Sequence, residues 1–185
     1  MKRQSEVFKL VEMAMYAAMI VLAIQFIRIP MPSAISNSMV HPGNALVAIS
    51  GLLMGYKRGM IASSLGLFIF DVLNGYGVPG AIETVLQSVV IVLLIELVYK
   101  MMRHRDTQFN IVMIGVWAAI LKIVMRYVIF FMKQLIIGTT FKAALATALT
   151  GMPATFFTAF VTIILVPVLY FGLKPIFARY HVIGE

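Results

Sequence analysis

Two basic side chains lie inside a stretch of sequence that is otherwise apolar and long enough to cross a lipid bilayer. Lys122 and Arg126 are four residues apart within the segment 109–131, so on a helix they share one face. Counted inward from Phe131 at 1.5 Å per residue, Arg126 lies roughly 7–8 Å deep and Lys122 roughly 13–14 Å deep. Two cations at these depths cost on the order of 5–7 kcal/mol on insertion scales, so the sequence must supply partners for them.

Suitable partners occur at a similar depth in three other apolar segments. They are two acids and two amides: Asp71, Glu83, Gln87 and Asn44. Glu83 and Gln87 are again four apart, so they also share a helical face. We therefore predict one polar layer in the outer third of a helical bundle, forming a pocket for a small polar solute, because ionisable groups within a membrane generally mark such sites. Two alternatives remain: an ion-paired network that only fixes helix register, and an Arg126 that snorkels to the lipid headgroups.

The composition places the whole chain in a membrane. Of its 185 residues 62% are hydrophobic and 12% are charged, and the apolar runs are continuous, which favours helices over a barrel. We predict an all-α, polytopic membrane protein with a single domain, residues 1–185, and six transmembrane helices in one bundle. The predicted spans lie near residues 8–27, 43–56, 59–73, 80–99, 109–131 and 149–173. The second and third are short, so we expect them either to tilt little or to be partly shielded by other helices or by a partner protein.

The charged links predict the orientation of the bundle. The links on one side are strongly basic, whereas the other side has only Arg28, Lys142 and Lys133. The basic side holds Lys2, Arg3, Lys9, Lys57, Arg58, Lys100, Arg103, Arg105, Lys174 and Arg179. The positive-inside rule then places both termini in the cytoplasm and the links 29–42, 74–80 and 133–148 outside. This bias also explains the net charge of +8 better than a nucleic-acid partner does, because no basic stripe is interleaved with aromatic residues.

Catalytic and metal-binding patterns are absent from the sequence. There is no cysteine, no P-loop, no Gly-x-Ser-x-Gly and no His-Glu-x-x-His. The histidines His41, His104 and His181 fall in three separate links, so they cannot share a metal ion. His41 lies beside the predicted pocket, where a capping or surface role is favoured over ligand binding. We therefore predict no enzyme activity, no cofactor and no metal site.

Small residues spaced four apart form a second pattern. Ala14 and Ala18 lie on one face of the first span, and Gly51, Gly55 and Gly59 continue the spacing through the second. Such faces let two helices approach closely within a bilayer. The partner helix belongs either to this bundle or to another membrane protein.

Four features of the sequence resemble the substrate-binding (S) components of energy-coupling factor (ECF) vitamin transporters. One is the six-span length with both ends inside. Another is the Ala14/Ala18 pair on the first span, which matches the alanine motif that those proteins use against their coupling subunit. The other matching segments are His41-Pro-Gly-Asn44, Leu53-Met-Gly-Tyr-Lys-Arg-Gly59, and Gly66-Leu-Phe-Ile-Phe-Asp71 leading to Asn74-Gly-Tyr76. The resemblance covers nearly the whole chain.

The resemblance implies a vitamin-sized ligand on the outer side, under the link after the first span and between spans four to six. It also implies a complex with one transmembrane coupling subunit and two ATP-hydrolysing subunits in the cytoplasmic membrane. The chain looks most like the members for hydroxymethylpyrimidine or pyridoxine-type ligands. Two other hypotheses stay open: a structural subunit of a cell-shape complex, and a solitary carrier that takes up a proton on Asp71 or Glu83.

Overall fold

The computed structural model describes residues 6–31 and 38–179. Lys2, Arg3 and His181 of the sequence predictions lie outside these ranges. Seven helices and two short strands are described, and the helices are α1 (Glu6–Phe26), α2 (Gly43–Met54), α3 (Tyr56–Leu73), α4 (Gly77–Met101), α5 (Gln108–Ile136), α6 (Phe141–Thr150) and α7 (Pro153–Arg179). Four of them, α1, α4, α5 and α7, are long and apolar enough to cross a membrane. The all-α class is confirmed.

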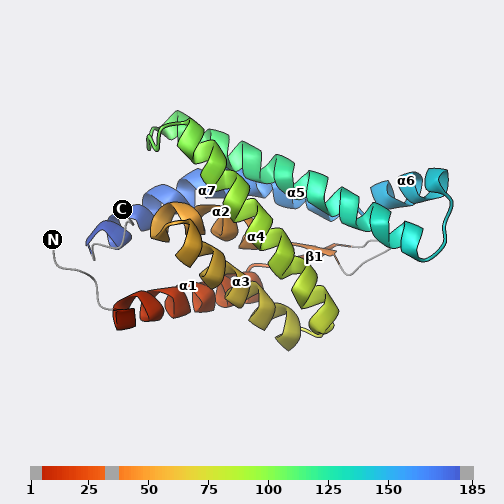
Figure 1. Cartoon of the computed structure of the whole chain (residues 1–185), viewed down its shortest axis with the longest axis horizontal. Helices are drawn as coiled ribbons and strands as arrows, with labels where there is room; N and C mark the ends of the chain where they lie inside the picture. The colour runs from red at the N-terminus through yellow and green to blue at the C-terminus, as the bar shows by residue number, and fades with distance from the viewer. Residues whose placement is uncertain (1–5, 32–37, 180–185) are drawn as a thin grey trace.

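The helices form one elongated bundle whose links gather at two ends (Figure 1). The start of α1, the α2–α3 turn, the α4–α5 link and the end of α7 lie at one end. The strands, the α3–α4 turn and α6 lie at the other end. The predicted basic links that the structure describes therefore share one end of the molecule. That this end faces the cytoplasm remains a prediction.

The short helix α2 occupies the centre of the bundle. All twelve of its residues are buried, and it contacts α3, α4, α5 and α7. Shielding by other helices, one of the alternatives expected for the short second span, is therefore observed. Gly55 makes the turn into α3 with φ of 81°, a conformation that side chains other than glycine rarely adopt. A β-carbon at Gly59 would come within 2.4 Å of the Ser50 carbonyl carbon, so the two helices meet backbone to backbone.

The links 29–42 and 133–148 contain secondary structure that the sequence did not predict. The link 29–42 contains β1 (Ile29–Met31) and β2 (Ser38–Val40), which pair antiparallel with Pro30 opposite Met39. The link 133–148 begins inside α5 and then forms α6, where the Thr140 hydroxyl caps the helix by accepting from the Ala143 N–H. The last span consequently starts at Pro153 rather than near residue 149.

Candidate ligand-binding site

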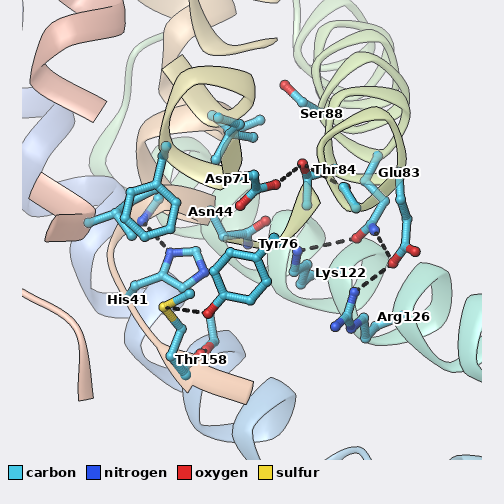
Figure 2. Close-up of a pocket in the computed structure, with 18 of the residues that line it drawn as sticks. His41, Asn44, Asp71, Tyr76, Glu83, Thr84, Ser88, Lys122, Arg126 and Thr158 are labelled. Atoms are coloured by element: carbon cyan, nitrogen blue, oxygen red, sulfur yellow. Dashed lines mark hydrogen bonds and ion pairs between the residues drawn. The ribbon is translucent and has the colours of Figure 1, made fainter. Parts of the chain in front are cut away.

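A cavity of about 440 Å³ opens between the helices in the half of the bundle that holds the strands. Six helices (α1, α2, α3, α4, α5 and α7), β2, the β2–α2 link and the α3–α4 turn contribute to its wall. All six residues predicted for the pocket line this one cavity: Asn44, Asp71, Glu83, Gln87, Lys122 and Arg126. Figure 2 shows Asn44, Asp71, Glu83, Lys122 and Arg126 approaching one another from α2, α3, α4 and α5.

One wall of the cavity is a polar ladder between α4 and α5. Arg126 Nη1 lies 2.8 Å from Glu83 Oε1, and Lys122 Nζ donates to Gln87 Oε1 at 3.3 Å (Figure 2). Gln87 Nε2 in turn donates to Glu83 at 3.4 Å. The spacing of four residues on each helix brings the two rungs into register. The ladder explains how two cations are accommodated at this depth.

The acids of the site are held by further polar groups. Asp71 accepts a hydrogen bond from the Thr84 hydroxyl, and the second oxygen of Glu83 pairs with Lys133 at the rim. The Arg126 guanidinium also lies 4.4 Å from the centre of the Phe130 ring, which adds a cation–π contact. Both acids are therefore bonded, whereas Lys122 has a neutral amide as its hydrogen-bond partner among the described residues.

The opposite wall is aromatic and uncharged. Phe70 and Tyr76 stack with ring centres 6.4 Å apart, and the Tyr76 hydroxyl contacts Met39 Sδ. His41 Nδ1 accepts from the Gly43 N–H at 3.1 Å, which leaves Nε2 to carry the proton. His41 also lines the cavity, so the choice between a capping or surface role and ligand binding remains a prediction. Burial, followed by the nearby charges of Lys122 and Arg126, lowers the pKa of His41 to about 3, so this histidine is neutral at physiological pH.

Three threonines of α7 were missed by the sequence analysis. Thr155 and Thr158 line the cavity, and Thr162 lies one turn further along the helix. Thr158 donates to the Met39 carbonyl oxygen at 3.4 Å and so joins α7 to β2. The spacing 155, 158 and 162 places all three on one face of an apolar helix, a pattern that the sequence shows on inspection.

The predicted partner-binding alanines lie on the outside of α1. Ala14 and Ala18 are exposed, whereas Ala17 is buried. Ala17 faces α3, where a β-carbon at Gly66 would come within 2.8 Å of the Ala17 carbonyl oxygen. The face carrying Ala14 and Ala18 is therefore separate from the face that packs within the bundle.

A protein-family model matches residues 4–175, nearly the whole chain. Its description is "ECF-type riboflavin transporter, S component". The chain belongs to this family. S components are the substrate-binding subunits of ECF importers and are not enzymes, because partner subunits hydrolyse the ATP. They work with a membrane coupling subunit and two ATPases and bind a small vitamin. No curated protein sequence matches the chain.

The fold agrees with this assignment. A solved structure described as "Structure and mechanism of the S component of a bacterial ECF transporter" superposes with a TM-score of 0.67. The two chains are 19% identical, and the match covers 93% of this chain and 98% of the other. At this identity the likeness establishes the shared fold and leaves the ligand to be argued from the cavity.

Proposed function

We propose that the cavity binds a neutral, water-soluble vitamin or vitamin precursor built on a nitrogen heterocycle, for import across the cytoplasmic membrane. The balance of charge within the cavity carries this proposal. Asp71 and Glu83 offset Lys122 and Arg126, and the additional cation, Lys133, has an exposed side chain at the rim. A ligand with a net charge would disturb this balance in a site where burial makes uncompensated charge costly. A neutral ring with donors and acceptors around its edge would not.

The walls suggest how such a ring is held. The ladder of α4 and α5 offers charged donors and acceptors to the edge of a heterocycle, and the stacked Phe70 and Tyr76 provide an apolar surface for its face. We propose that Asn44, Asp71, Glu83, Gln87, Lys122 and Arg126 are the ligand-binding residues. Hydroxymethylpyrimidine or a pyridoxine-like compound, each a single hydroxylated ring, is the first candidate ligand.

Riboflavin is a second candidate, and two observations favour it. The family model is described by riboflavin transport. The cavity of about 440 Å³ also falls within the range of roughly 300–1,000 Å³ that is typical of sites for larger organic ligands, so a single ring would leave part of it to water.

Native mass spectrometry of the detergent-purified chain tests the ligand class and identifies the compound. Cells grown in rich medium should yield a protein with a retained mass that matches one neutral heterocyclic vitamin. Isothermal titration with hydroxymethylpyrimidine, pyridoxine and riboflavin then ranks the candidates, with the anionic vitamins pantothenate and biotin as controls. Tight binding of an anionic vitamin, with none of the three neutral ones, would overturn the proposal.

We also propose that the exposed Ala14/Ala18 face of α1 docks onto the coupling subunit. Small side chains permit close approach of a helix from that subunit. The double substitution Ala14→Trp and Ala18→Trp should abolish co-purification with the coupling subunit and leave vitamin binding unchanged. The matched control is Leu97→Trp, because Leu97 is an exposed apolar residue on a different helix, α4. An intact complex in the double variant would exclude this face.

A further inference from the structure

Asn44 lines the cavity, and its side-chain amide is hydrogen-bonded to a residue of α7 that lies behind the cavity wall. Its side chain is buried, with 3% of its surface exposed, and Nδ2 donates to Thr162 Oγ1 at 3.1 Å. Thr162 is itself 1% exposed, and it does not line the cavity. Thr162, which lies behind the cavity wall, therefore contacts Asn44, which is part of the wall and is labelled in Figure 2.

The hydrogen bonds of Thr162 fix which way round the Asn44 amide lies. The Thr162 hydroxyl donates to the carbonyl oxygen of Thr158 at 2.7 Å, and a carbonyl oxygen can only accept. Because a hydroxyl has one proton, Thr162 can only accept from Asn44. The amide must therefore turn its NH₂ group toward Thr162, so its orientation follows from the bonding pattern even though amide oxygen and nitrogen are hard to distinguish by shape.

The carbonyl oxygen of Asn44 is then left on the other side of the amide. Among the residues that the structure describes, the Asn44 side chain makes its hydrogen bond through Nδ2, and Oδ1 is not one of the fully buried atoms that lack a partner, so Oδ1 is open to the cavity. A nearly buried acceptor is generally matched by a donor, here one that enters the cavity. The neighbouring His41 presents a donor rather than an acceptor, because its Nδ1 accepts from Gly43 and its Nε2 is left to donate.

We infer that Asn44 Oδ1 accepts a hydrogen bond from an N–H or O–H group of the ligand, and that Thr162 is the positioning residue that imposes this polarity. The inference rests on the proposed function of the cavity and deepens it. It requires a ligand with a donor at this point of its edge, and it disfavours one that presents a ring nitrogen lone pair or a carbonyl there.

Matched variants of Thr162 test the ligand part of the inference. Thr162→Val keeps the shape but removes the hydroxyl, whereas Thr162→Ser keeps the hydroxyl and serves as the rescue. The probes are hydroxymethylpyrimidine, pyridoxine and riboflavin, each compared with counterparts methylated singly at each N–H or O–H group. Thr162→Val should weaken binding of the unmodified probe by about 10- to 100-fold, the effect expected when a buried hydrogen bond is lost, and Thr162→Ser should restore it.

The methylated probes separate positioning from a merely structural role. The probe that is methylated at the group facing Asn44 should bind the parent protein weakly. It should lose no further affinity in Thr162→Val, because it has no donor for Oδ1 in either protein. Equal losses for every probe and counterpart would show a structural role and overturn the inference. Unchanged binding in Thr162→Val would overturn it as well.

A readout without ligand distinguishes failure of this inference from failure of the proposed function. With ¹⁵N-labelled asparagine, the side-chain NH₂ of Asn44 should exchange slowly with solvent in the parent and in Thr162→Ser, and faster in Thr162→Val. Equal exchange in all three would overturn the positioning by Thr162. Slow exchange in a parent chain that binds none of the probes would instead refute the ligand class, and with it the ligand part of the inference, while the positioning part stands.

Discussion

Two networks of charged and polar side chains lie toward opposite ends of the bundle and use similar chemistry. The cavity network joins Glu83, Gln87, Lys122 and Arg126 between α4 and α5. The link network surrounds Asp106 in the α4–α5 link, which accepts from the Tyr99 hydroxyl and from Lys174 Nζ at the end of α7. Each network contains a lysine, a carboxylate and a neutral polar partner.

The networks differ in what they leave unbonded. Each oxygen of Asp106 has its own donor, and neither Asp106 nor Lys174 lines the cavity. In the cavity network Lys122 donates to the neutral amide of Gln87, and the remaining N–H donors of the Lys122 ammonium group can bind a group in the cavity. An ion pair between helices is therefore weak evidence for a binding site. Spare hydrogen-bonding capacity that faces an open volume is much better evidence.

The largest effect should separate the two networks by function. Lys122→Met should weaken vitamin binding by about 100-fold or more, because loss of one partner from a buried polar network costs several kcal/mol. Lys174→Met removes the same charge from the link network and should leave the dissociation constant within about twofold. Isothermal titration on both variants measures the contrast. Similar binding losses in the two would mean that the cavity network has no special role.

The link network should matter for stability instead. Burial alone would raise the pKa of Asp106, but hydrogen bonds from Lys174, Tyr99 and Tyr170 outweigh it and hold the pKa below its usual value. Asp106→Asn should lower the free energy of unfolding by about 1–3 kcal/mol at neutral pH, because it removes the charge that these groups stabilise. The stabilisation is present above the ordinary aspartate pKa and is lost as the pH falls below it.

Thermal unfolding in detergent measures this loss, and each kcal/mol corresponds to roughly 2–4 °C for a chain of this size. Vitamin binding by Asp106→Asn, measured below its unfolding temperature, should equal that of the parent. If Asp106→Asn changed the free energy of vitamin binding more than the free energy of unfolding, the proposed difference between the two networks would be contradicted.

A smaller effect, on the pH dependence of stability, should distinguish His41 near the cavity network from His104 near the link network. Folding lowers the pKa of His41 from 6.5 to about 3, so the unfolded chain binds the proton more tightly than the folded chain. Stability linked to His41 is complete above pH 6.5 and is lost as the pH falls, by about 1 kcal/mol per pH unit. His41→Asn should remove this part of the acid sensitivity and still accept the Gly43 N–H through an Asx-turn.

The matched control is His104→Asn in the α4–α5 link. His104 is exposed and has φ of 50°, which asparagine tolerates, so this variant controls for the loss of a histidine away from the cavity. Unfolding temperatures of the three chains between pH 7 and pH 5 provide the test. Parallel curves for all three would show that burial of His41 does not govern its protonation.

The contrast between the networks also explains what the sequence could reveal. Lys122 and Arg126 were identifiable because charge is costly inside an apolar helix, and the matching spacing of Glu83 and Gln87 predicted the second side of the ladder. Asp106 lies in a polar link, where an acid is unremarkable, so nothing in its neighbourhood predicted a contact with Lys174, which is 68 residues away along the chain.

The remaining differences between the predictions and the structure lie where single polar or capping residues stand within an apolar stretch, so that hydropathy alone is misleading. Thr162 resembles any tolerated polar residue in an apolar span, and its role depends on Asn44 of another helix, 118 residues away. Residues 141–150 are apolar enough to be taken as part of a link or of the last span. Thr140 and Pro153, which mark the starts of two separate helices, were the signals that could have divided them.

The smallest effect concerns the rim of the cavity network and tests whether exposure limits its contribution. Lys133 pairs with Glu83, as Arg126 does, but the Lys133 side chain is 55% exposed against 21% for Arg126. Because solvent screens an exposed pair, Lys133→Met should change vitamin affinity by no more than about threefold, and less still in high salt. Arg126→Met is the comparison and should approach the effect of Lys122→Met. A Lys133→Met loss as large as that of Arg126→Met would mean that the bound ligand encloses the rim, so that the site extends outward past Glu83.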